Sequence, residues 1–252
     1  MSVSYEVGGP VAVITIDRPE VRNAVDPATA QAMREAFERF NHDAAVVAAV
    51  LAGARGTFCA GYDLKSIAED RGGAHVDESD GPMGPTRMSL DKPVIAAIEG
   101  YAVAGGLELA LWCDVRIAAR DAVLGVFNRR FGVPLIDGGT VRLPRMVGHG
   151  RAMELILSGR PVNAEEAMRI GLVERLCEPG RALAEATSFA RRLADFPQGA
   201  LRADRRSALD QWSLNLQDAL RAEHRGGAEV IASGEAREGA RRFVEGQGRH
   251  GA

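Results

Sequence analysis

Two glycine-containing stretches and one glutamate carry the residues of this sequence that could do chemistry. The stretches are GTFCAGYDLK (56–65) and EGYAVAGGLELA (99–110), and each follows an apolar run and leads into a segment with helical character. The first backbone N–H groups of a helix have no intrahelical acceptor, so two such turns can aim two N–H donors at one oxygen atom. Glycine at positions 105 and 106 would let a ligand carbonyl approach the backbone closely.

Glu108 lies three residues after Gly105, which places it on the same face of the expected helix. A carboxyl group beside two N–H donors can move a proton while the donors stabilise an enolate oxygen, and chemistry at the α-carbon of a thioester needs both. A structural alternative also fits the same residues. The glycine pair would then permit close packing, and the helix dipole would favour Glu108 in the first turn.

Other familiar catalytic motifs are absent from the sequence. It contains no GxSxG nucleophile elbow, no HExxH, no Walker A motif and no GxGxxG, and its five histidines lie in dissimilar contexts. The three cysteines, Cys59, Cys113 and Cys177, are far apart and lack metal-ligand spacing. We therefore expect no metal site, no triad hydrolase, and a reducing intracellular compartment.

The composition is that of a soluble globular protein. The 252 residues are 46% hydrophobic and 26% charged, and the formal net charge of −3 gives no reason to expect nucleic acid or an anionic membrane as a partner. The N-terminus lacks the pattern of a signal peptide, and the apolar stretch 93–113 is interrupted by Glu99 and Glu108. We therefore expect a cytoplasmic protein without a membrane span.

Strand and helix signals alternate along the first half of the chain. Apolar runs closed by Gly, Pro or Asp predict strands, and Asp26 followed by Pro27 predicts the N-cap of a helix. This alternation predicts an α/β core with at least some parallel strand pairing. The expected strands are 11–17, 46–53, 91–100 and 115–119, and the expected helices are about 28–41 and 105–112.

From Gly138 onward the sequence is typical of helices. Pro197 marks a boundary between an α/β core (1–196) and a C-terminal helical region (197–252). Apolar stripes in that region predict oligomerisation, with packing against the chain's own core as the alternative. Residues 70–87, rich in Gly, Pro, Asp and Ser, are expected to form either a lid or a disordered surface loop. The expected helices are 138–147, 149–158, 163–171, 180–195, 204–222 and 235–246, and the stripes include Leu209, Trp212, Leu216 and Leu220.

Taken together, these motifs resemble the crotonase superfamily, the enoyl-CoA hydratase/isomerase family. The resemblance covers nearly the whole chain and implies a spiral of ββα units with a C-terminal helical region, assembled as a homotrimer or a hexamer. It implies a coenzyme A thioester as substrate and no bound cofactor. The matching segments are IDRPEVRNAVD (16–26), GTFCAGYDLK, KPVIAAIEGYAVAGGLELALWCDVRIAA (92–119), LVERL (172–176), FPQGAL (196–201) and EGARRFVEG (238–246).

The resemblance also assigns roles to individual residues. The oxyanion donors would be the backbone N–H groups of Tyr62 and Gly105, and Glu108 falls on the first of the two catalytic glutamates of the hydratases. Tyr62 replaces a smaller residue common in the family, so its ring would narrow the acyl pocket. Coenzyme A would lie along Arg22, Ala24, Ala60, Asp63 and Leu64.

The sequence departs from the family at the second catalytic glutamate, where it has Asn128. An amide cannot take or give a proton at neutral pH. In one interpretation Glu108 alone does the acid–base work, or shares it with Asp137, and Asn128 positions water or substrate. In the other, Asp137 is the N-cap of the helix that begins near Gly138.

These residues favour an acyl-CoA enzyme, and hydration of a 2-enoyl-CoA is the leading hypothesis. A double-bond isomerase needs only one shuttling carboxyl group, which suits the loss of the second glutamate, and other acyl-CoA reactions remain open. A hypothesis of a different class is a non-catalytic acyl-CoA-binding protein, because a fold can keep its pocket after losing a proton-transfer group.

Overall fold

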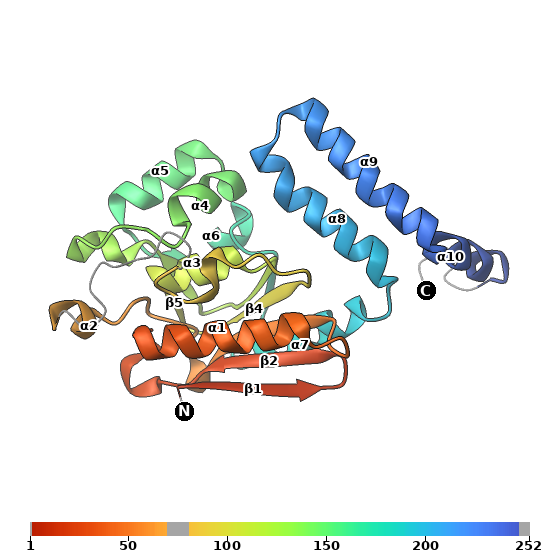
Figure 1. The fold of residues 1–252 in the computed structure, drawn as a ribbon. Coiled ribbons are helices and arrows are strands. Elements are labelled where there is room, and N and C mark those ends of the chain that lie inside the picture. The colour runs from red at the N-terminus through yellow and green to blue at the C-terminus, as the bar shows by residue number, and fades with distance from the viewer. Residues whose placement is uncertain (1, 70–80, 247–252) are drawn as a thin grey trace.

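The computed structural model describes residues 2–69 and 81–246 of the chain. A central sheet forms the base of the molecule, helices cover both of its faces, and three C-terminal helices extend away from it (Figure 1). This arrangement confirms the predicted α/β fold. None of the helices in the described part of the chain is long and apolar enough to span a membrane.

The larger sheet has six strands, and only its edge pair, β1 with β2, is antiparallel. The strand order is β1 (Val3–Gly8), β2 (Val11–Ile16), β3 (Ala48–Gly53), β4 (Val94–Ile98), β6 (Val115–Ala119) and β9 (Arg175–Cys177). A smaller sheet contains β5 (Tyr101–Val103), β7 (Val123–Gly125) and β8 (Val162–Asn163).

Strand–strand–helix units build the region that holds the site. β4 and β5 are followed by α3 (Gly105–Trp112), and β6 and β7 are followed, after a 3-10 turn, by α4 (Gly139–Val147). The other helices are α1 (Pro27–His42), α2 (Leu64–Ala68), α5 (His149–Ser158), α6 (Ala164–Arg169), α7 (Ala182–Leu193), α8 (Gln198–Asp210), α9 (Leu216–Ser233) and α10 (Glu235–Val244).

Alternate residues of the central strands point to opposite faces of the sheet, and each face packs against different helices. On one face, Ile14, Leu51 and Ala96 belong to the cluster that includes apolar residues of α1 and α3. On the other face, the cluster contains neighbouring strand residues and the alanine stripe of α7. Both faces are therefore covered, as is usual for parallel strands. The alanines are Ala182, Ala186 and Ala190.

Glu99, one of the two carboxylates in the apolar stretch, caps the start of α7. Its side-chain oxygens accept hydrogen bonds from the backbone nitrogens of Gly180 (3.0 Å) and Ala182 (2.8 Å). A negative charge at the N-terminal end of a helix is favoured by the helix dipole. Glu99 therefore has a structural role: it stabilises the start of α7.

Most of the helices and strands expected from the sequence are present within a few residues of their predicted bounds. Asp26 caps α1 as predicted, with its Oδ1 accepting from the Thr29 nitrogen at 2.8 Å. The single helix predicted at 204–222 is wrong, because the chain forms α8 and α9 there. Asn215 breaks the pattern: its Oδ1 accepts from the nitrogen of Asp218 at 3.0 Å and starts α9. Strands β1, β5, β7, β8 and β9 were not predicted.

Candidate active site

A cavity of about 490 Å³ opens where the starts of α2 and α3 meet the turn after β7. Its lining is mainly apolar, with a few polar side chains that converge on it, which is the usual character of a small-molecule site. The polar lining residues are Tyr62, Glu108, Asn128 and Asp137. The others are Ala60, Leu64, Ile67, Pro82, Met83, Val103, Ala104, Gly105, Phe127, Phe131, Val133, Pro134 and Ile136.

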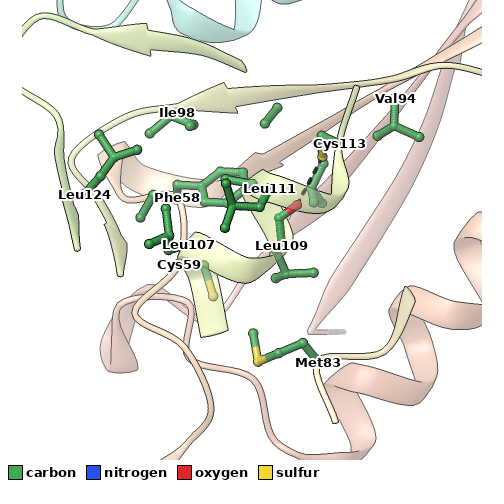
Figure 2. Packing of buried hydrophobic residues seen from close by; sticks show 14 of the residues in the cluster. Phe58, Cys59, Met83, Val94, Ile98, Leu107, Leu109, Leu111, Cys113 and Leu124 are labelled. Carbon is green, nitrogen blue, oxygen red and sulfur yellow. Dashed lines mark hydrogen bonds between the residues drawn. The ribbon is translucent and has the colours of Figure 1, made fainter. Parts of the chain in front are cut away.

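Helix α3 is held rigidly behind this cavity by its apolar residues. Leu107, Leu109 and Leu111 are at most 2% exposed, and they pack among residues such as Phe58 and Leu124 (Figure 2). Every residue from Gly105 to Leu111 is buried. The first turn of α3 therefore has a fixed position relative to the sheet.

The glycines near this first turn allow close contact between the two predicted oxyanion segments. A Cβ at Gly106 would lie 2.1 Å from the backbone oxygen of Cys59, and one at Gly61 would lie 2.9 Å from the Gly105 nitrogen. Gly106 thus serves packing against residues 59–61. This contact is the close packing that the structural alternative predicted for the glycine pair.

The two predicted donors, the N–H groups of Tyr62 and Gly105, make no hydrogen bond within residues 2–69 and 81–246. Ala104, directly before Gly105, has a φ of +53°, a backbone conformation that L residues with a side chain rarely adopt. Its N–H donates to the Gly125 oxygen at 2.9 Å, which holds this strained residue in place. Strain of this kind is often kept where it orients a functional group.

Glu108 is 2% exposed and lines the cavity. Its Oε1 accepts hydrogen bonds from the backbone nitrogens of Asp137 (2.9 Å) and Gly139 (2.8 Å). A Cβ at Gly139 would lie 2.9 Å from the same oxygen, so glycine is needed for this approach. Within the described residues Oε2 has no hydrogen-bond partner, which leaves one carboxyl oxygen available for proton transfer.

Burial raises the pKa of Glu108 to about 7, and repulsion from the Asp137 carboxylate acts in the same direction. The two backbone N–H groups and the Arg142 guanidinium oppose this rise in pKa. A carboxyl group with a pKa near neutrality can both accept and donate a proton at physiological pH. Perturbed carboxyl groups in clefts are typical of catalytic sites.

Asp137 is not the N-cap of α4, so that interpretation is wrong. Gly138 occupies the N-cap position, and no side chain caps the helix there. The Asp137 carboxylate faces the other way: its Oδ1 accepts from the backbone nitrogen of Met83 at 3.0 Å and from the Thr86 hydroxyl. Burial raises the pKa of Asp137, and these two hydrogen bonds oppose the rise.

Asn128 lines the same cavity and is 5% exposed. Its Nδ2 donates to the backbone oxygen of Val133 at 2.9 Å, and its Oδ1 has no partner in the described part of the chain. A buried acceptor without a donor is unfavourable, so a donor from water or a ligand would stabilise it.

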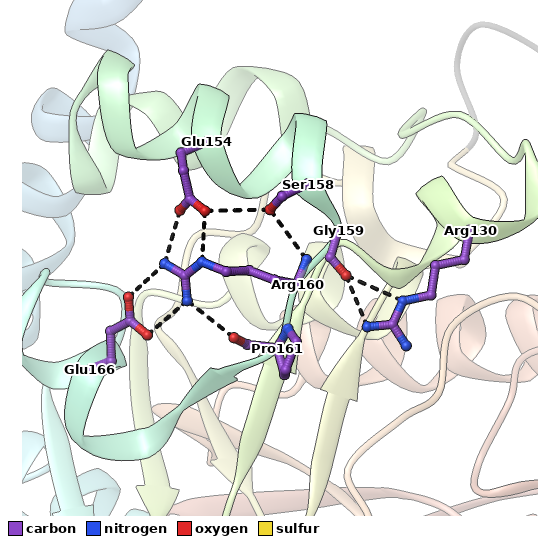
Figure 3. A network of polar contacts seen from close by, with 7 residues as sticks. All are labelled: Arg130, Glu154, Ser158, Gly159, Arg160, Pro161 and Glu166. Carbon is purple, nitrogen blue, oxygen red and sulfur yellow. Dashed lines mark hydrogen bonds and ion pairs between the residues drawn. The ribbon is translucent and has the colours of Figure 1, made fainter.

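The 3-10 turn that carries Asn128 (Phe127–Phe131) is attached to α5 and α6 by a network of arginines (Figure 3). Arg130 donates to the Gly159 oxygen through Nε (3.3 Å) and Nη2 (3.0 Å). The neighbouring Arg160 donates to the carboxylates of Glu154 and Glu166, which lie on α5 and α6. Arg130 thus fastens to the end of α5 the turn that lines the cavity with Phe127, Asn128 and Phe131.

The five residues predicted to contact coenzyme A lie in two adjacent segments. The Arg22 oxygen accepts from the Ala60 nitrogen at 3.1 Å, and Arg18 joins the Ala24 oxygen (2.6 Å) to the Asp63 carboxylate (3.2 Å). Asp63 also caps α2 through the Lys65 nitrogen. Leu64 and Ala60 line the cavity. The structure thus brings these residues together. The Asp63 carboxylate already accepts hydrogen bonds from Arg18 and from the Lys65 nitrogen.

Sequence reasoning missed several residues that build the site. Met83, Thr86 and Arg142 all contact Asp137, and Asn23 joins the Ala54 and Thr57 oxygens near the first donor segment. Met83 and Thr86 lie in the part of the predicted loop 70–87 that the structure describes; residues 70–80 lie outside the described residues. No local signal marked these four residues, because their partners are distant in sequence.

Comparison with known proteins shows the family of the chain. The model of the family Enoyl-CoA hydratase/isomerase matches residues 6–250. Enoyl-CoA hydratase EchA19 of Mycobacterium tuberculosis is 33% identical over 244 residues, covering 94% of this chain and 91% of that protein. The (E)-benzylidenesuccinyl-CoA hydratase of Thauera aromatica is 35% identical over 228 residues, covering 89% and 88%.

Solved structures agree as well. The crystal structure of enoyl-CoA hydratase EchA1 from Mycobacterium marinum matches with a TM-score of 0.91 and 38% identity, covering 97% of this chain and 96% of that one. Fold, family match and sequence relatives thus point the same way over nearly the full length. The chain belongs to the enoyl-CoA hydratase/isomerase family, the crotonase superfamily of acyl-CoA enzymes.

Proposed function

We propose that this protein hydrates 2-enoyl-CoA thioesters, with Glu108 as its acid–base residue. The observation that carries the proposal is the buried Glu108 carboxyl group, with a pKa of about 7, in an apolar cavity that also exposes the start of α3. The hydratases among its relatives support the same reaction class.

In the proposed reaction the thioester oxygen accepts hydrogen bonds from the N–H groups of Tyr62 and Gly105. The ionised Glu108 removes a proton from water as the water oxygen bonds to the β-carbon, and the double-bond electrons move to the thioester oxygen as an enolate. The two N–H donors stabilise that developing charge. Glu108 then delivers the proton to the α-carbon, so one water is added across the double bond and the carboxylate is regenerated.

Asn128 takes the place of a second acid–base group in this scheme. Its unpaired Oδ1 can accept a hydrogen bond from the attacking water, but it cannot transfer a proton. Both proton transfers therefore fall to Glu108. The aromatic and aliphatic lining, including Phe127, Phe131 and Ile136, suits an apolar acyl group.

Isomerisation of an enoyl-CoA is the second candidate, and Asn128 is the observation that favours it. A single carboxyl group suffices to move a proton between the α- and γ-carbons. A second glutamate would serve mainly to activate water, which isomerisation does not need. The same pocket would stabilise the same type of enolate.

A panel of coenzyme A thioesters separates these candidates. We expect 2-enoyl-CoA to be converted to 3-hydroxyacyl-CoA, followed by loss of the conjugated thioester absorbance and by mass spectrometry of the product. Conversion of a 3-enoyl-CoA to the 2-enoyl isomer without addition of water would support the isomerase. Binding of all the thioesters by calorimetry without turnover would instead indicate a non-catalytic acyl-CoA-binding protein.

We also propose that residues 197–252 assemble the chain into a homotrimer or hexamer. In the single chain, α8, α9 and α10 contain no buried residue, and Trp212, Leu216 and Ile231 are 54%, 72% and 69% exposed. Exposed apolar surface on this scale marks an interaction site. Light scattering at micromolar concentration should give three or six times the chain mass of 26.8 kDa, and a monomeric mass would refute the assembly.

A further inference from the structure

Asp137 joins two segments that are far apart in sequence and that meet at the cavity wall. Its Oδ1 accepts from the Met83 nitrogen (3.0 Å) and from the Thr86 hydroxyl, so the segment 81–87 wraps around its carboxylate. A Cβ at Gly81 would lie 2.7 Å from the same Oδ1, which shows how closely the chain approaches. Both Thr86 and Asp137 are at least nine-tenths buried.

The backbone around Asp137 holds Glu108 at the same time. The nitrogens of Asp137 and Gly139 donate to Oε1 of Glu108 at 2.9 and 2.8 Å. The side chain of Asp137 therefore points to the 81–87 segment while its own N–H points to the acid–base residue.

Two arginines attach the same two segments to each other through backbone oxygens. Arg142 donates to the Asp137 oxygen (2.8 Å) and to the Thr86 oxygen (2.7 Å), and Arg87 donates to the Ile136 oxygen (2.9 Å). The Arg142 guanidinium thus binds carbonyl groups and makes no direct contact with the Asp137 carboxylate. The carboxylate is held by neutral donors and remains a source of negative potential beside Glu108.

The segment that Asp137 holds forms part of the cavity. Pro82 and Met83 line it, and Met83 is fully buried. The Met83 sulfur is so close to the first residue of α3 that a Cβ at Gly105 would lie 2.6 Å from it. Met83 therefore sets the space above the predicted N–H donor of Gly105.

We propose that Asp137 is a positioning residue that takes no part in proton transfer: its carboxylate fastens residues 81–87 over the cavity, and its backbone fixes the orientation of Glu108. This inference rests on the proposed function, since it assigns the acid–base chemistry to Glu108 alone. The charged and titratable groups that face Glu108 are Asp137, Arg142 and, across the cavity, Tyr62.

The charge on Asp137 has a second consequence for the site. A like charge nearby disfavours ionisation, so the Asp137 carboxylate helps to raise the pKa of Glu108. Asparagine at position 137 has the same shape and keeps an oxygen that can accept from Met83 and Thr86, but it has no charge. Exchange of Asp137 for asparagine therefore separates the electrostatic effect from the anchoring.

The experiment is a ¹³C NMR titration of the glutamate carboxyl carbons, with Glu108 assigned by its absence in Glu108→Gln. In the wild type, Glu108 should titrate near pH 7. In Asp137→Asn it should titrate lower by about one pH unit. The matched control is Asp91→Asn, which removes the same charge from an exposed ion pair with Arg206 and should leave the Glu108 titration unchanged.

Turnover provides the second measurement. In Asp137→Asn the acidic limb of the pH profile of kcat/KM should move to lower pH with the titration, and kcat at its maximum should fall less than about 10-fold, whereas loss of a proton-transfer group would reduce it about 10²–10⁴-fold at every pH. Thr86→Val removes one anchor and keeps the charge, so it should raise KM without lowering the pH at which Glu108 titrates.

An unchanged Glu108 titration in Asp137→Asn would overturn the proposal, as would loss of turnover at every pH in that variant. If the wild type turns over no thioester, the proposed function fails, but the titration still tests the role of Asp137. If Asp137→Asn does not fold, wild-type hydrogen exchange decides: a protected Met83 amide supports the anchor, and an amide that exchanges at the rate of an open loop overturns it.

Discussion

Replacement of Glu108 by glutamine should reduce kcat for hydration of a 2-enoyl-CoA by about 10³-fold or more, with thioester affinity largely retained. Glutamine has nearly the same shape and can still accept from the nitrogens of Asp137 and Gly139, which donate to Oε1 in the wild type. It cannot remove a proton from water, and Asn128, at the position where the resemblance implies a second catalytic glutamate, cannot do so either. Steady-state kinetics and calorimetric binding of a saturated acyl-CoA measure the two effects.

The role of Glu108 as a base also predicts how kcat/KM depends on pH. Because the pKa of Glu108 is about 7, wild-type kcat/KM for hydration should fall as the pH decreases below 7, where the base becomes protonated. The residual activity of Glu108→Gln should lack this limb. Wild-type turnover in the glutamine variant would contradict the role assigned to Glu108.

The raised pKa of Glu108 also predicts how the stability of the fold depends on pH. Glutamate ordinarily has a pKa of 4.5, and in the folded chain that of Glu108 is about 7. Below pH 4.5 both states are protonated; as the pH rises to 7 the unfolded state ionises first, so the folded state loses stability and stays less stable above pH 7. Glu108→Gln should therefore unfold at a higher temperature than the wild type at pH 8, with a smaller difference at pH 5.

Replacement of Gly105 by proline should reduce kcat by about 10²–10³-fold, because it removes one of the two N–H donors proposed to bind the enolate oxygen. Gly105 is the first residue of α3. Proline fits the first position of a helix, where the N–H has no intrahelical acceptor, but a residue before proline prefers extended backbone and Ala104 has a φ of +53°. Thermal melting and circular dichroism of the variant therefore accompany the kinetics, so that loss of the donor is separated from local damage to the turn.

Gly105→Ala is the matched control for the proline variant. Either substitution adds a Cβ that meets the flexible Met83 side chain, 2.6 Å from its sulfur in the present arrangement, but alanine keeps the N–H. We expect Gly105→Ala to retain much more activity than Gly105→Pro, with thermal melting to compare their stability. Equal activity of the two variants would exclude the Gly105 N–H as an oxyanion donor.

The sequence by itself determined the elements whose signals are local. The helix at 105–112 and the strand at 115–119 have their predicted bounds, and Asp26 caps α1. The spacing of Gly105 and Glu108 is also local, because three residues of helix place both near one opening whatever the rest of the chain does. The error at 204–222 was of the same local kind, since the break depends on the cap at Asn215.

Only the tertiary structure decided what Glu108 and Asp137 touch. The hydrogen bonds from Asp137 and Gly139 to Glu108 span 29 and 31 residues, and that from Met83 to Asp137 spans 54. Contacts at such separations depend on how the sheet, α3 and the 81–87 segment pack together. Local signals suggested a helix cap at Asp137, since Asp before Gly-Gly is typical of one. In the folded chain its carboxylate instead accepts from the Met83 nitrogen and the Thr86 hydroxyl. A buried carboxylate needs hydrogen-bond donors, and only the tertiary packing brings these two donors to it.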